Sequence, residues 1–179
     1  RFFAGANLPG QPADPRALVE QGYESGVPMG GTISGASRSP NFTVWASKDP
    51  EGANLDRIQI VKGWVDAQGE PQDKTFDVAW SGDRKPGKSG KVPAVGRTVD
   101  LQKATYTNEI GSGELMGTWT DPDFDPAKPA LYYVRVLEIP TPRWTTFDAV
   151  RNKLELLPDV PSAIQERACH GIESTIVPS

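Results

Sequence analysis

An apolar strand that runs into a proline-rich corner constrains this chain more than any other segment. In residues 130–146, ALYYVRVLEIPTPRWTT, apolar residues occupy both alternating faces of the first half, as in a strand buried within a sheet. Pro140 and Pro142 then end the strand, because neither ring carries an N–H and each fixes its own φ. The corner predicts a defined direction for Arg143 and Trp144.

A guanidinium beside an indole at a stiff turn suits recognition of an anion or a planar group, so Arg143 and Trp144 are candidate ligand-binding residues. The structural alternative is that Trp144 fills the end of a core and Arg143 pairs with a nearby carboxylate.

The composition favours short strands over long helices. The chain has 179 residues, enough for one well-buried domain, and contains 18 Gly and 17 Pro. We expect a mainly β fold, an antiparallel β-sandwich-like region with one or two short helices and long loops. Strands are predicted at 42–46, 58–65, 75–80, within 99–110, at 114–119 and from 131 onward.

Two helices are predicted. The first has Asp14 as N-cap, Pro15 at its first position and Gly22 as its stop. The second spans 146–156, with Phe147, Val150 and Leu154 at helical spacing. Residues 26–39 and 81–93 are predicted to be loops, the latter mobile and at the surface.

Charge and cysteine content exclude several classes of function. The net charge is −4 with scattered Lys and Arg, which argues against nucleic acid as a partner. No apolar run approaches the roughly 20 residues that a membrane span requires. The single His170 argues against a Ser/His/Asp triad, and adjacency argues against a dyad of Cys169 with His170. A zinc site of Cys and His needs more ligands than the chain has.

An acidic turn offers the candidate metal ligands of the chain. Asp121, Asp123 and Asp125 copy the first three ligand positions of a calcium loop. Pro126 replaces the glycine that permits the sharp turn, and Tyr132 stands where the bidentate Glu belongs, which favours a turn shaped by its prolines.

The amino-acid sequence resembles that of a bacterial family, domain-of-unknown-function family 3604. The phrases that carry the resemblance are VPMGG (27–31), DPEGANLDRIQIVKGW (49–64), DVAWSGDR (77–84), TVDLQKATYTNEIG (98–111), WTDPDFDP (119–126), YYVRVLEIPTPRWTTFDA (132–149) and IQERA (164–168). Full-length members look like metal-dependent hydrolases of the polymerase and histidinol phosphatase (PHP) type. The resemblance implies that residues 1–179 are a single C-terminal accessory region whose catalytic PHP-like part lies upstream.

The same resemblance implies that a divalent metal belongs to the upstream part, that this chain carries no cofactor, and that the parent protein is periplasmic or secreted. The chain opens Arg1-Phe2-Phe3 without an initiator Met, which we interpret as the start of a piece of a longer polypeptide.

Three hypotheses for function follow. The preferred one is a non-catalytic region that packs on and completes a PHP-like hydrolase. The alternative is a free-standing carbohydrate- or ligand-binding β-sandwich module, in which some of the five tryptophans stack on a ring instead of filling the core. The third is an independent enzyme that uses only carboxylates.

Overall fold

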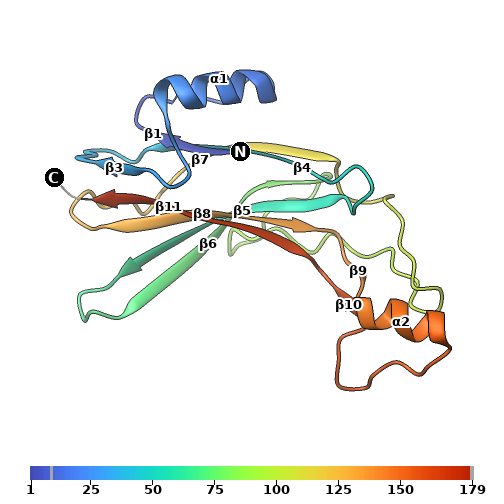
Figure 1. The fold of residues 1–179 in the computed structure, drawn as a ribbon. Helices are drawn as coiled ribbons and strands as arrows, with labels where there is room; N and C mark the ends of the chain where they lie inside the picture. Colours follow the sequence, from blue (N-terminus) through green and yellow to red (C-terminus); the bar gives the residue numbers. More distant parts are fainter. Residues whose placement is uncertain (9, 178–179) are drawn as a thin grey trace.

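Two β-sheets packed against each other make up most of the molecule (Figure 1). The computed structural model describes residues 1–8 and 10–177. For residues 170–177 it describes the backbone only. The smaller sheet has the order β2-β1-β4-β7, with β1 Phe2–Gly5, β2 Val27–Pro28, β4 Asn41–Ser47 and β7 Glu114–Thr120. The larger sheet has the order β3-β11-β8-β5-β6, with β3 Thr32–Ser34, β5 Leu55–Val65, β6 Pro71–Trp80, β8 Ala130–Glu138 and β11 Arg167–Val177.

The remaining elements are two helices and a small ribbon. These are α1 Pro15–Ser25, α2 Trp144–Asn152, and a two-stranded sheet of β9 Thr141–Pro142 and β10 Ala163–Ile164. The prediction of a mainly β, antiparallel, sandwich-like fold is confirmed. The exception among the described pairs is β3, which runs parallel to β11.

Strand β8 lies in the middle of the larger sheet, between β11 and β5. Val134 stands opposite Ile60 of β5, and Tyr132 and Val134 point into the sandwich and are buried. Leu131 and Tyr133, on the other face, are only half-buried. The predicted strand is therefore confirmed, but only its inner face is fully buried.

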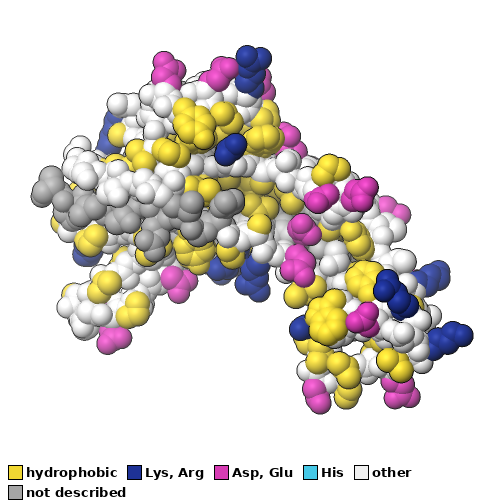
Figure 2. All heavy atoms as spheres, in the orientation of Figure 1, with side chains coloured by type: hydrophobic (Ala, Val, Ile, Leu, Met, Phe, Trp, Pro, Cys, Tyr) yellow, Lys and Arg dark blue, Asp and Glu magenta, His cyan; other side chains and the backbone are white. Residues whose placement is uncertain are grey.

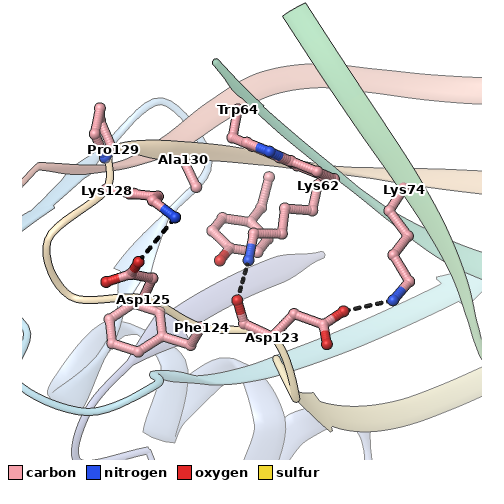
Figure 3. A pocket seen from close by; sticks show the side chains of 10 residues that line it. Lys62, Trp64, Lys74, Asp123, Phe124, Asp125, Lys128, Pro129 and Ala130 are labelled. Carbon is pink, nitrogen blue, oxygen red and sulfur yellow. Dashed lines mark hydrogen bonds and ion pairs between the residues drawn. The ribbon is translucent and has the colours of Figure 1, made fainter. Parts of the chain in front are cut away.

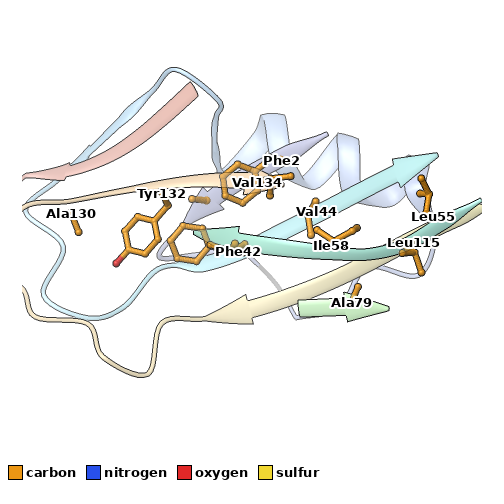
Figure 4. Close-up of a cluster of buried hydrophobic side chains, with 12 residues drawn as sticks. Phe2, Phe42, Val44, Leu55, Ile58, Ala79, Leu115, Ala130, Tyr132 and Val134 are labelled. Carbon is orange, nitrogen blue, oxygen red and sulfur yellow. The ribbon is translucent and has the colours of Figure 1, made fainter. Parts of the chain in front are cut away.

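Aromatic side chains from both sheets meet in the core (Figure 4). The ring of Phe42 lies 5.9 Å from that of Phe2, 5.3 Å from Trp119 and 4.6 Å from Tyr132. Trp119 also lies 4.7 Å from Phe76 of β6. Each such pair adds roughly 0.5–1.5 kcal/mol beyond the area that it buries, so this cluster ties the sheets together.

Helix α1 begins as predicted and ends later. Asp14 accepts a hydrogen bond from the N–H of Ala17, and Pro15 is the first helical residue. Gly22 does not stop the helix, which continues to Ser25 and ends at Gly26. The reason for Gly22 is packing, because the ring of Phe3 occupies the space where a Cβ would lie.

The β5–β6 hairpin is confirmed, with its turn at residues 66–69. The prediction of a strand within residues 99–110 is wrong. That segment is a loop with a single bridge between Asp100 and Thr105, because the Asp100 carboxylate accepts hydrogen bonds from the N–H groups of Gln102 and Lys103 and forms a turn. The loop predicted at 26–39 contains the short strands β2 and β3.

Helix α2 begins two residues before its predicted start and ends before Leu154. Lys153 has φ 55°, in the left-handed region, and its N–H bonds back to Val150. Leu154 therefore lies beyond the helix. Among the described residues, no helix has the length and apolar character needed to cross a membrane.

Candidate functional site

The predicted Arg143–Trp144 pair lies where the chain leaves the sandwich. Arg143 is the N-cap residue of α2 and Trp144 is its first residue. Trp144 is 66% exposed, so the alternative in which it fills the end of a core is wrong. In the described part of the chain, the Arg143 side chain makes no ion pair or hydrogen bond, and its Nε is buried without a partner.

Backbone contacts fix the direction of this corner. Pro142 pairs with Ala163 across the β9–β10 ribbon, and the N–H of Arg143 donates to the carbonyl of Ser162 at 3.0 Å. The fully buried Thr146 hydroxyl donates to the same carbonyl at 2.6 Å. The corner that the two prolines predicted is therefore fixed by the β9–β10 pairing and by two hydrogen bonds to the carbonyl of Ser162.

The segment from 139 to 166 projects from the sandwich as an arm and exposes large apolar side chains (Figure 2). We call these five residues the arm patch: Trp144, Phe147, Leu154, Leu156 and Leu157. The sequence predicted that Phe147 and Leu154 would lie on one helical face, but they are 40% and 66% exposed instead of packed in the core.

The three aspartates of the acidic turn each face a different lysine. Asp121 Oδ2 lies 2.5 Å from Lys62 Nζ, and Asp123 Oδ2 lies 2.5 Å from Lys74 Nζ. Asp125 Oδ2 lies 3.2 Å from Lys128 Nζ. The structure does not gather these carboxylates around one point, and the described residues contain no group of three or more His, Cys, Asp or Glu placed to hold a metal ion.

The pair of Lys62 with Asp121 is buried and was not predicted. The two side chains are 8% and 0% exposed, and the Tyr132 hydroxyl donates to the same Asp121 oxygen at 2.6 Å. Burial, together with the Asp121 carboxylate, raises the pKa of Tyr132. The signal in the sequence was Lys62 itself, a charge inside the apolar run IQIVKGWV at an inward position of its strand.

A cavity of about 360 Å³ opens beside this pair, between the β5–β6 hairpin and the β7–β8 loop (Figure 3). We call it the Trp64 cavity. Its apolar lining includes Trp64, Phe124 and Tyr132, and its polar lining includes Lys62, Lys74 and Asp123. Trp64 was one of the tryptophans considered for stacking, but the sequence did not place it beside the acidic turn.

A second buried network anchors the loop that follows β6. Asp56 pairs with Arg57 at 3.0 Å and with Arg84 at 2.7 Å. Asp77 accepts hydrogen bonds from Gln59 at 2.7 Å and from the N–H of Val92 at 2.7 Å. Residues 85–91 are exposed as predicted, but both ends of this loop are tied to the sheet.

Cys169 and His170, the pair considered for catalysis, lie in β11. Cys169 is exposed, and the side chain of His170 lies outside the described part of the chain. A cleft of about 420 Å³ between the sheets is lined by Lys48, Asp49 and Glu138, among others. Burial raises the pKa of Glu138, and the nearby Glu166 and Asp49 carboxylates raise it further.

Comparison with known protein families decides the membership of the chain. A family model described as Protein of unknown function (DUF3604) matches residues 1–172. The chain belongs to this family. Membership in DUF3604 accounts for the resemblance seen in the sequence, and the description of DUF3604 assigns no activity to it. No curated protein and no solved structure matches the chain.

Proposed function

We propose that this DUF3604 chain is the non-catalytic C-terminal region of a PHP-like metal-dependent hydrolase, which it packs against and completes. In this proposal the arm patch is the contact surface, and Arg143 and Trp144 stand at the mouth of the active site. The observation that supports it most is the arm patch, because all five of these large apolar side chains are exposed and belong to the one projecting segment.

The exposure of these side chains favours a contact surface. Full burial of a large apolar side chain contributes about 1.5–3 kcal/mol, and contiguous exposed apolar patches typically mark interaction sites. Trp144 and Leu154 are each 66% exposed, so a partner surface would gain much of this free energy. The fixed corner at Pro142 and Ser162 lowers the entropy that binding would cost.

The charge of Arg143 supports the second half of the proposal. Its guanidinium has no ion-pair partner in the described residues, and the next residue in the chain is the exposed Trp144. Such a pair suits an anionic or planar group of a substrate held by the neighbouring part. We assign the divalent metal to that part, because the one histidine and one cysteine of this chain supply few of the ligands that catalytic metals prefer.

The test is association between this chain and the PHP-like part of the parent, expressed separately and mixed in an analytical ultracentrifuge. We expect a complex that the double substitution Trp144→Ala with Leu154→Ser weakens by about tenfold or more. Val65→Ser is the matched control, since Val65 is 56% exposed but lies at the end of β5 in the sandwich.

Two results would contradict the proposal. One is a complex whose affinity is unchanged by the double substitution. The other is metal-dependent hydrolysis of bis-p-nitrophenyl phosphate by this chain alone, with Mn²⁺ added.

A further inference from the structure

We infer that the Trp64 cavity binds a neutral saccharide, with the sugar ring stacked on Trp64 and its hydroxyls bonded to Lys62 and Asp123. This site goes beyond the accessory role proposed above and does not depend on it. Its volume of about 360 Å³ falls in the range of small-ligand pockets, roughly 300–1,000 Å³.

The base of the cavity holds a lysine with one donor to spare. Lys62 Nζ donates to Asp121 Oδ2 at 2.5 Å and to the carbonyl of Asp123 at 2.8 Å. An ammonium has three N–H donors, so one is left for a ligand. Figure 3 shows the Lys62 nitrogen between Trp64 and Asp123, and it lies 5.7 Å from the centre of the Trp64 ring.

The β7–β8 loop, which forms one wall of the cavity, supplies an acceptor. Asp123 Oδ2 pairs with Lys74, while its Oδ1 accepts no hydrogen bond from the described residues. The hydrogen bond from Lys74 holds the pKa of Asp123 below its ordinary value, so this carboxylate is ionised at neutral pH. A residue with a free donor and a residue with a free acceptor thus both line the cavity, as a ring that carries several hydroxyls requires.

The charges around the cavity cancel. Three lysines, Lys62, Lys74 and Lys128, are paired one to one with Asp121, Asp123 and Asp125. An anionic ligand would meet these carboxylates and a cationic ligand would meet the ammonium groups, so neither charge sign is favoured. A neutral ligand avoids both costs.

The apolar side of the cavity completes the match. Trp64 and Phe124 contribute aromatic surface to the cavity lining, and Pro129 and Ala130 add further apolar surface. A sugar ring has an apolar C–H face and a rim of hydroxyls, which fits an indole on one side and charged hydrogen-bonding groups on the other.

The test is calorimetric titration of the whole chain with maltose, cellobiose, lactose and N,N′-diacetylchitobiose, and with galacturonic acid and glucosamine as charged probes. We expect at least one neutral disaccharide to bind and the charged sugars to bind more weakly. Trp64→Ala should weaken binding by about tenfold or more. Val65→Ala, the neighbour on the opposite face of β5, should leave the affinity unchanged.

A second measurement covers the case in which Trp64→Ala unfolds the protein. This measurement is the NMR chemical shift of the indole N–H groups in the unmodified chain. Among the five tryptophans, Trp64 should show the largest shift when the disaccharide is added. Stronger binding of galacturonic acid or glucosamine, no binding by any neutral disaccharide, or a larger shift at Trp144 than at Trp64 would each overturn the inference.

Discussion

Lys62 on β5 and Asp121 after β7 form a buried ion pair across the sandwich, with Nζ 2.5 Å from Oδ2, although the two residues are 59 positions apart in the sequence. Taking both charges out of water costs several kcal/mol, which their attraction offsets only when the remaining hydrogen-bonding groups are satisfied. Tyr132 and the carbonyl of Asp123 supply two of those partners, and one N–H of Lys62 is left for a ligand. The pair is buried beside Tyr132 of the core, and Lys62 also lines the Trp64 cavity.

We predict that Lys62→Met lowers the free energy of unfolding by about 3–5 kcal/mol, because Asp121 is left buried and uncompensated. Urea unfolding followed by Trp fluorescence measures this change. The added substitution Asp121→Asn should recover part of the loss. Lys74→Met is the control, since its pair with Asp123 is half exposed and should contribute about 0–1 kcal/mol. A loss below that of the control would contradict the prediction.

We predict that Gly22→Ala destabilises the chain by about 1–3 kcal/mol, although alanine gains up to about 1 kcal/mol over glycine in an open helix. A Cβ at Gly22 would lie 2.6 Å from Cε2 of the buried Phe3 ring, and closer to two other ring atoms. Thermal unfolding measures the change. Phe3→Leu should reduce the added cost of Gly22→Ala, whereas Gly10→Ala, where a Cβ meets nothing within 4 Å, should have little effect.

We predict that Glu138→Gln stabilises the chain at pH 7, by up to about 0.5 kcal/mol. Burial and the carboxylates of Glu166 and Asp49 raise the pKa of Glu138 in the folded state. At pH values above this raised pKa, the ionised Glu138 side chain therefore destabilises the folded state. That cost shrinks as the pH falls through the raised pKa and is gone below the ordinary value of about 4.3.

Urea unfolding at pH 7 and at pH 4 measures the difference between the Glu138→Gln variant and the unmodified chain. Glu166→Gln should change stability at pH 7 in the same direction, because it removes one of the two repulsive charges. A gain that increases toward acid pH would refute this account.

We predict that Asp77→Ala makes the loop at residues 85–91 sensitive to trypsin. The Asp77 carboxylate is 1% exposed and binds Arg57, Gln59 and the N–H of Val92, so its loss leaves three donors without their acceptor. Cleavage after Lys88 or Lys91, followed by mass spectrometry, reports the change. The control is Asp83→Ala, a substitution of an exposed residue two positions before this loop, and this variant should be cleaved at the rate of the unmodified chain.

The amino-acid sequence alone determined the elements whose signals are local. Asp14 and Pro15 marked the start of α1, the alternation around Tyr132 and Val134 marked β8, and Pro140 and Pro142 marked the corner. The strand predicted near Thr105 failed because a side chain, Asp100, turned the backbone more strongly than the local β propensity extended it.

The tertiary structure decided which distant residues meet. Trp144 and Trp64 look alike in the sequence, yet one is exposed on the arm and the other lines a cavity beside Asp123. Asp121 lies in an acidic turn that copies a calcium loop, but its partner is Lys62, which strand pairing brings from another part of the chain. Spacing along the sequence fixes backbone conformation over a few residues, whereas the pairing of charges depends on sheet register and on packing between the sheets.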